Sequence, residues 1–183
     1  MTRPSCKNLI LDAAETLVLR VGAAHMTLDA VAEEAGVSKG GVLYHFSTKE
    51  ALLECMLRRH IERGKERRRE TIAQMPPGPA QELKGEIVAQ VVARDPNDRM
   101  CAAFLAAIAN DPRLMSAIRE IQHERYGRLV KPEISFERSV VLLLAVDGLF
   151  FHELLQSSPF TAEQRQRIVE TLVGLADELA VKE

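Results

Sequence analysis

Residues 27–46 read TLDAVAEEAGVSKGGVLYHF, and this stretch predicts two short helices joined by a tight turn. Apolar residues recur at helical spacing over 28–35, so the first helix is expected to bury one face. Thr27 is suited to cap the start of that helix, and Gly36 to end it in the left-handed conformation. Ser38 is then expected to cap the second helix. A small residue, a glycine corner and a buried valine at this spacing are typical of a helix-turn-helix.

The second expected helix, residues 39–46, has a composition that a purely structural role does not explain. Gly40 and Gly41 lie in its first turn, where each costs about 1 kcal/mol relative to alanine. Their bare backbone can, however, come close to a phosphate or a base edge. With Val42 and Phe46 turned inward, the polar and aromatic side chains project, which suits a DNA groove lined by phosphates. The alternative is a buried helical hairpin with one solvated lysine.

The next residues, Ser47–Glu50 (STKE), predict a capping box in which Ser47 and Glu50 satisfy each other's backbone donors. Lys49 then lies in the first turn of a new helix, where its charge opposes the helix dipole. A DNA phosphate would compensate for this placement and would also meet the free N–H groups of the helix start. A merely exposed lysine is the alternative. The residues expected to contact DNA are Thr27, Ser38, Lys39, Gly40, Gly41, Leu43, Tyr44, His45 and Lys49.

Over about its first 60 residues the sequence resembles the tetracycline-repressor (TetR) family of bacterial transcription regulators. The resemblance rests on Thr27, Gly36-Val37-Ser38, Gly40, Tyr44-His45-Phe46 and Lys49-Glu50. The family commonly has a tyrosine two places before the histidine, where this chain has Leu43, so Tyr44 is expected to take over a phosphate contact. The resemblance implies a cytoplasmic, ligand-responsive regulator, usually a repressor, that binds a palindromic double-stranded DNA operator as a homodimer.

The composition favours an all-α fold. Hydrophobic residues make up 46% of the 183 residues, enough for a real core, and no segment alternates with period two. The net charge of −2 is unevenly spread: residues 1–70 carry 12 Lys and Arg against 10 Asp and Glu, and the rest carry 12 against 16. The first part is therefore the better partner for a polyanion. We expect an N-terminal three-helix DNA-binding domain over 1–48, joined by a long helix to a C-terminal helical effector-binding and dimerisation domain over 49–183.

Amphipathic spacing also predicts the helices outside the helix-turn-helix. They are expected over 7–21, 49–74, 81–93, 100–108, 112–129, 136–155 and 161–179. The charged segment 62–70 (ERGKERRRE) predicts pairing along a solvated helix face, and Pro76–Pro79 and the RDPND turn at 94–98 separate the next helices. A second capping box is expected at Thr161–Gln164.

The helix expected over 136–155 is apolar on more than one face, as a helix would be that packs on its own subunit and on a partner. Gly148 would allow close approach there. With 161–179 it predicts an antiparallel hairpin, and two hairpins make a four-helix bundle between two copies, which is also how the family dimerises. Such a dimer presents two reading helices one DNA turn apart, roughly 34–36 Å. Asp147 needs a partner inside this apolar helix, for which an arginine across the dimer interface, a cationic ligand and water are the alternatives.

A small hydrophobic or cationic effector is expected in a cavity between the C-terminal helices. The candidate lining residues, many equally suited to a core, are Met56, His60, Met100, Phe104, Ile108, His123, Tyr126, Asp147, Phe150 and Phe151.

Other classes of protein are disfavoured. Residues of types that enzymes use in catalysis, such as Cys101 and His152, do not occur at the spacing of any known catalytic motif. No cofactor is expected. Cys6, Cys55 and Cys101 form no CxxC pair, which speaks against zinc and disulfides and suits a reducing cytoplasm, with a thiol sensor as the alternative to inert side chains. No metal site is expected, and the longest apolar run is too short to span a bilayer. A helical protein-interaction module is the weaker alternative.

Overall fold

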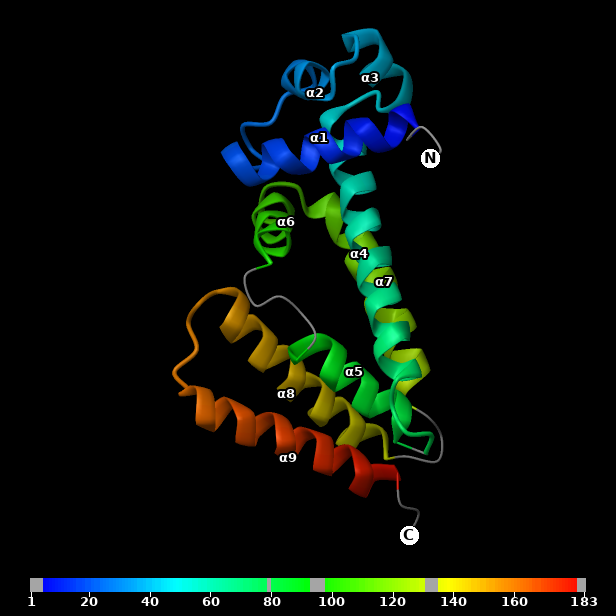
Figure 1. The fold of residues 1–183 in the computed structure, drawn as a ribbon, viewed down its shortest axis with the longest axis vertical. Helices are drawn as coiled ribbons and strands as arrows, with labels where there is room; N and C mark the ends of the chain where they lie inside the picture. The colour runs from blue at the N-terminus through cyan, green and yellow to red at the C-terminus, as the bar shows by residue number, and fades with distance from the viewer. Residues whose placement is uncertain (1–4, 79, 93–97, 131–134, 181–183) are drawn as a thin grey trace. The chain divides into compact units, whose positions relative to one another are not determined.

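The computed structural model describes residues 5–78, 80–92, 98–130 and 135–180. Within these ranges the chain forms α-helices and one short 3₁₀-helix, with no strand, which confirms the all-α prediction (Figure 1). The elements are α1 (Cys6–Val21), α2 (Leu28–Ala35), α3 (Lys39–His45), α4 (Lys49–Ala73), α5 (Gln81–Val91), α6 (Arg99–Asn110), η1 (Pro112–Leu114), α7 (Met115–Leu129), α8 (Phe136–Leu154) and α9 (Ala162–Ala180).

The helix ends lie close to the predicted ones, with one local difference. The helix predicted over 112–129 starts as the 3₁₀-helix η1 and becomes α-helical at Met115. Asp111 caps this start, because its carboxylate accepts the backbone N–H of Arg113 at 3.1 Å and Pro112 needs no acceptor. The last residue of the helix predicted over 81–93, most of the turn at 94–98 and the break at Lys131-Pro132 lie outside the described residues.

Packing divides the chain into two compact units. The first comprises Met1–Glu62 with Arg99–Arg119, and the second comprises Arg63–Asp98 with Glu120–Glu183. The long helix α4 begins in the first unit and continues into the second, so it is the predicted covalent connection. The division at residue 48 concerns which residues meet DNA, and it stays a prediction.

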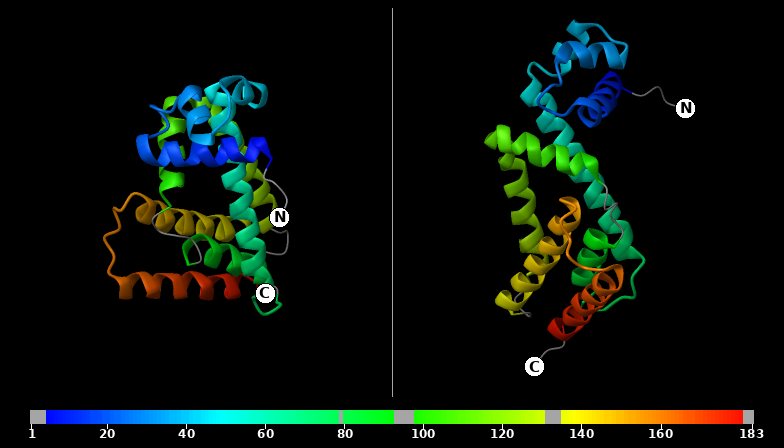
Figure 2. Two further views of the ribbon diagram at one scale, coloured as in Figure 1. Left: turned by 45° about the horizontal axis from the view of Figure 1, so that its top comes forward. Right: turned by 90° about the vertical axis from the view of Figure 1, so that its left-hand side faces the viewer.

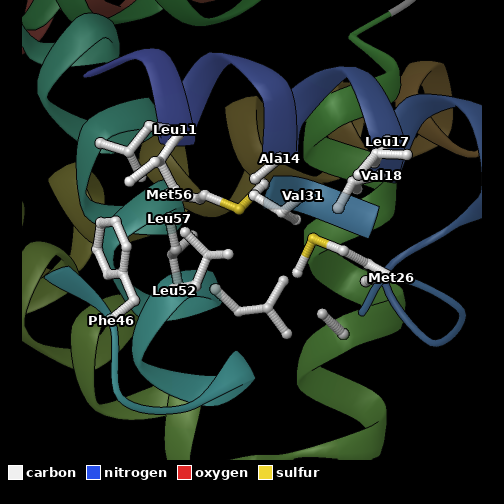
Figure 3. Packing of buried hydrophobic residues seen from close by; sticks show 14 of the residues in the cluster. Leu11, Ala14, Leu17, Val18, Met26, Val31, Phe46, Leu52, Met56 and Leu57 are labelled. Carbon is white, nitrogen blue, oxygen red and sulfur yellow. The ribbon is translucent and has the colours of Figure 1, made fainter. Parts of the chain in front are cut away.

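The first unit has an apolar core to which α1, α2, α3 and α4 all contribute (Figure 3). Met26, in the connector after α1, is almost completely buried and closes this core as predicted. Each fully buried side chain of this type contributes about 1.5–3 kcal/mol. Arg59 of α4 also donates to Glu15 at 3.1 Å and to Asp12 at 2.8 Å, both on α1. The three short helices are therefore held as one body on the first half of α4.

The second unit contains the predicted hairpin of α8 and α9, and α5 packs against both helices (Figures 1 and 2). The predicted capping box at the start of α9 is confirmed. The N–H of Gln164 donates to the Thr161 hydroxyl at 3.2 Å, and the N–H of Thr161 donates to the Gln164 side chain at 2.9 Å. The inner face of α8 carries Leu142, Leu143, Val146 and Leu149, all buried.

The close helix approach in this unit is at Gly85 of α5. A Cβ added there would lie 2.2 Å from Cγ1 of Ile72 on α4, which is far inside contact distance. Gly148, singled out from the sequence, instead borders open space in its own chain, because no atom lies within 4 Å of an added Cβ.

Replacing Gly85 by alanine is therefore expected to lower the free energy of unfolding by about 1–3 kcal/mol, although alanine is the better helix former. Urea denaturation followed by circular dichroism measures this change. Gly127→Ala in α7 is the matched control, since its added Cβ would meet no atom within 4 Å. An unchanged midpoint for Gly85→Ala would contradict the tight contact with Ile72.

Candidate functional site

The turn between α2 and α3 is built from local hydrogen bonds that the sequence predicted. The Thr27 hydroxyl accepts the N–H of Ala30 at 3.2 Å and so caps α2. Gly36 takes φ +66°, in the left-handed region, and ends the helix. The Ser38 hydroxyl accepts the N–H of Gly41 at 3.0 Å and caps α3. These bonds fix the direction in which α3 leaves the turn.

The two faces of α3 differ sharply. Val42 and Phe46 are buried in the core of the first unit, as predicted. On the other side Tyr44 is 85% exposed and Leu43 is also exposed. The Tyr44 ring lies edge-on to that of His45, with centroids 5.1 Å apart. A short helix thus presents an aromatic and an apolar side chain to the outside, with the half-buried His45 beside them.

Gly40 and Gly41 have no structural requirement in this fold. Neither has a positive φ, and an added Cβ would lie 3.9 Å and 3.4 Å, respectively, from the Ser38 hydroxyl, which is ordinary contact. Alanine at either position would favour the helix by up to about 1 kcal/mol. The glycines therefore make the helix weaker than it has to be, and they leave the backbone of its first turn bare.

Both predicted cations of this region have a partner within the chain. The Lys39 Nζ lies 2.8 Å from the Asp29 carboxylate, and the Lys49 Nζ donates to the carbonyl oxygen of Ala24 at 2.6 Å. An exposed ion pair such as Lys39–Asp29 contributes about 0–1 kcal/mol. A phosphate could therefore replace Asp29 at small cost.

The cap predicted for α4 is wrong by one residue. The hydroxyl that accepts a helix N–H is that of Thr48, from Ala51 at 3.1 Å, and not that of Ser47. The Thr48 carbonyl also accepts the N–H of Leu52, which marks Thr48 as the last residue before the helix. Because Ser47 and Thr48 both carry a hydroxyl, either residue could cap the helix, and the STKE motif alone does not show which of them does. Lys49 still lies in the first turn, as predicted.

The ten residues predicted to line an effector cavity are divided between the two units. The first unit holds Met56, His60, Met100, Phe104 and Ile108, of which Met56 and Phe104 are fully buried in its core. The second unit holds His123, Tyr126, Asp147, Phe150 and Phe151. His123 and Phe151 are exposed, and the rings of Phe150 and Phe151 lie 5.3 Å apart. The lining of an effector site by these residues stays a prediction.

Asp147 has a partner that was not among the three predicted ones. Arg125 of the same chain donates through Nη1 to both carboxylate oxygens, at 2.7 Å and 2.9 Å. Burial raises the pKa of the Asp147 carboxyl, and the charge of Arg125 opposes this shift. The partner was missed because it lies 22 residues away on another helix, where helical spacing gives no signal.

Asp147 belongs to a buried cluster of charges centred on Glu86. One Glu86 oxygen accepts Nε of Arg125 at 2.8 Å; the other lies 2.8 Å from Nη2 of Arg128 and 3.0 Å from Nε of Arg68. The signal for Glu86 was present in the sequence, since helical spacing places it beside buried Leu83 and Ile87. The assignment of Arg68 to a solvated face was wrong, because this side chain is largely buried against Glu86.

Two sequence profiles match this chain. Residues 10–56 match the one described as "Bacterial regulatory proteins, tetR family", and residues 86–177 match "Tetracyclin repressor-like, C-terminal domain". The chain belongs to the TetR family. Regulators of the TetR family are DNA-binding transcription factors with a C-terminal ligand-binding domain and are not enzymes. This confirms the prediction of a DNA-binding regulator and the prediction that the protein is not an enzyme.

Solved structures share this TetR fold over nearly the whole chain. A transcriptional regulator from Rhodococcus sp. Rha1 is 21% identical, with a TM-score of 0.67, covering 97% of this chain and 99% of that one. A TetR transcription regulator from Haloarcula marismortui is 18% identical, with a TM-score of 0.72 and coverages of 96% and 98%. GusR from Salmonella enterica is 20% identical, with a TM-score of 0.68 and coverages of 97% and 98%. Among curated protein sequences none matches.

Two further findings concern the described part of this TetR-family chain. None of its helices is long and apolar enough to cross a membrane. The same residues contain no group of three or more His, Cys, Asp and Glu side chains that could hold a metal ion. Cys6, Cys55 and Cys101 form no disulfide with one another.

Proposed function

We propose that this TetR-family protein is a cytoplasmic repressor that binds a palindromic operator as a homodimer and is released by a small effector. The observation that carries the proposal is the outer face of α3, which combines a bare, glycine-rich first turn with exposed Leu43 and Tyr44 and half-buried His45. The fold itself requires neither the glycines nor the exposed aromatic side chain. Close approach of a rigid groove explains both features.

In the proposed complex, α3 lies in the major groove. Leu43, Tyr44 and His45 face base edges and the nearest phosphates, and the bare turn at Gly40 and Gly41 lets the backbone come close. The remaining proposed contacts are with phosphates and position the protein on the duplex. Lys39 and Lys49 provide the cations, and Thr27 and Ser38 lie at helix starts, where free N–H groups point outward.

The proposed dimer uses an exposed apolar stripe on α8. Val141, Leu144, Phe151 and Leu155 follow one another at helical spacing, and all four are exposed in the single chain. Gly148 lies on the same stripe, with open space around it, so a second helix could approach closely there. Contiguous apolar surface of this kind marks an interaction site. Pairing of α8 and α9 with their copies would give a four-helix bundle.

The proposed division of labour assigns DNA binding to residues 1–48 and effector binding and dimerisation to 49–183. Of the two effector types predicted from the sequence, a hydrophobic one is better supported than a cationic one. The carboxylate that would attract a cation, Asp147, is already bonded to Arg125. The effector must bind the DNA-competent and incompetent states unequally, because otherwise it cannot shift the balance between them.

Lys49→Ala is expected to weaken binding to all duplex sequences to a similar extent and to reduce the salt slope by about 1, since one phosphate contact is lost. Fluorescence anisotropy titrations of labelled DNA at several salt concentrations measure both quantities. Arg167→Ala, which removes an exposed cation from α9, is the control. Unchanged affinity and slope for Lys49→Ala would reject its role.

Tyr44→Ala is expected to lower operator affinity about tenfold, or about 1.4 kcal/mol, and to leave the thermal midpoint unchanged. The reason is that this side chain is 85% exposed and contributes little to the core. Gel-shift titrations and a thermal melt of the same sample give the two values. Wild-type gel shifts would exclude Tyr44 from the interface.

The whole proposal is tested by selecting fragments of the source genome on the purified protein. Enrichment of an inverted repeat with half-sites one helical turn apart is expected, from the two-fold symmetry of the dimer. Recovery of unrelated fragments without a shared sequence would contradict the proposal that the protein binds a specific palindromic operator.

A further inference from the structure

The charge cluster of the second unit contains a buried donor without an acceptor. The Arg125 side chain is 7% exposed, its Nε donates to Glu86, and its Nη1 donates to Asp147. Its Nη2 is buried and has no hydrogen-bond partner within the described residues. A buried donor left unsatisfied costs about 1–3 kcal/mol, and more when the group is charged.

The neighbouring carboxylates cannot supply the missing acceptor from their present positions. One oxygen of Glu86 accepts from Arg125, and the other is shared by Arg68 and Arg128. Both oxygens of Asp147 accept from Nη1 of Arg125. The amide oxygen of Gln122 also accepts from Nη1 of Arg125, at 3.5 Å. The acceptors described around Arg125 therefore each have a donor, whereas Nη2 has no acceptor among the described residues. An occupant of this place has to bring an acceptor, which excludes an ammonium group.

The apolar surroundings indicate the rest of the occupant. On α8, Asp147 lies among buried Leu143, Val146 and Phe150, which share its inner face at helical spacing. Hydrogen bonds with an ionised partner are roughly twice as strong as those between neutral groups, and in a guanidinium–carboxylate bond both partners are ionised. A molecule with one carboxylate and an apolar body would meet both features.

We propose that Arg125 anchors the carboxylate of a hydrophobic monocarboxylate effector through its Nη2. The inference rests on the proposed function for the effector's regulatory role, but the binding site itself does not depend on DNA. It adds a residue that the sequence did not single out. It also replaces the cationic effector by an anionic one.

Isothermal titration calorimetry on the full-length chain tests the class of ligand with three probes of matched chain length: octanoate, octanol and octylamine. Octanoate is expected to bind at least tenfold more tightly than the other two probes, because it alone offers a charged acceptor. Inorganic phosphate is a fourth probe, which separates a carboxylate site from a general anion site. Equal or tighter binding of octanol, octylamine or phosphate overturns the inference.

A pair of variants tests the residue. Arg125 alone cannot be removed safely, since Glu86 and Asp147 would lose a buried partner, so Arg125→Met is combined with Asp147→Leu. This double variant is expected to keep its helical circular dichroism and cooperative melting and to lose at least tenfold in octanoate affinity. Arg167→Gln removes an exposed cation of α9 and is expected to bind octanoate like the wild type. A folded double variant with undiminished octanoate affinity overturns the inference.

If the double variant does not fold, a measurement on the wild-type chain replaces it. The ¹⁵N-resolved guanidinium signals of Arg125 are expected to shift on addition of octanoate and to stay unchanged with octanol. The absence of a shift counts against the inference. A chain that binds octanoate through Arg125 but selects no DNA sequence would refute the proposed function and leave the carboxylate site standing.

Discussion

Replacing Leu144 by glutamate is expected to make the protein monomeric and to lower its operator affinity by roughly 100-fold or more, which is about 2.7 kcal/mol. Leu144 is 57% exposed in the single chain and lies in the middle of the α8 stripe. In the proposed dimer it would be buried beside its own copy, where an added carboxylate has no cation to meet. Burial of two unpaired charges costs several kcal/mol. A monomer would present only one α3 to the operator.

Sedimentation velocity gives the oligomeric state, and anisotropy titration on a palindromic operator gives the affinity. Val92→Glu is the matched control, because Val92 is also exposed and apolar but lies outside the α8 stripe. This control is expected to remain dimeric. A dimer of undiminished affinity in Leu144→Glu would show that another surface holds the two copies together.

Replacing Gly40 and Gly41 together by alanine is expected to stabilise the protein and to impair DNA binding at the same time. The free energy of unfolding should rise by about 1–2 kcal/mol, since both added Cβ atoms have room and alanine favours the helix. Operator affinity should fall at least tenfold, or about 1.4 kcal/mol, because the methyl groups would stand between the backbone and the DNA. A stabilised protein that binds less well cannot be explained by loss of structure.

Urea denaturation and anisotropy titration on the same preparation measure the two changes. Gly64→Ala in α4 is the control for helix propensity, since its added Cβ has its nearest neighbour at 3.8 Å. It is expected to stabilise the chain without changing affinity. Full operator affinity in the double alanine variant would mean that the bare turn does not face DNA.

The sequence predicted the local features of the fold well, because each depends on neighbouring residues. Thr27 and Ser38 cap helices through bonds that reach only three residues ahead, and the left-handed turn at Gly36 needs only the glycine itself. The inward position of Val42 and Phe46 follows from the periodicity of one short helix. The outward face of α3 therefore follows from the order of its residues alone.

The features that the sequence did not predict depend on contacts between distant residues. The ion pair of Arg125 with Asp147 joins two helices, and so does the contact of Gly85 with Ile72. Neither residue type nor spacing identifies such partners, because many arginines and several glycines were available. Glu86 is the exception, since its place on the inner face of α5 could have been read from the helical repeat.

The pairing of Lys39 with Asp29 has a consequence for how the protein searches a genome. In the proposed complex Lys39 would exchange Asp29, whose carboxylate lies 2.8 Å away, for a phosphate, and that carboxylate would remain close to the DNA. In the proposed complex this exchange lowers the gain from the phosphate contact by the same amount on random and on cognate DNA. The acidic neighbour would therefore weaken binding to both, and discrimination between them would come from the base contacts alone.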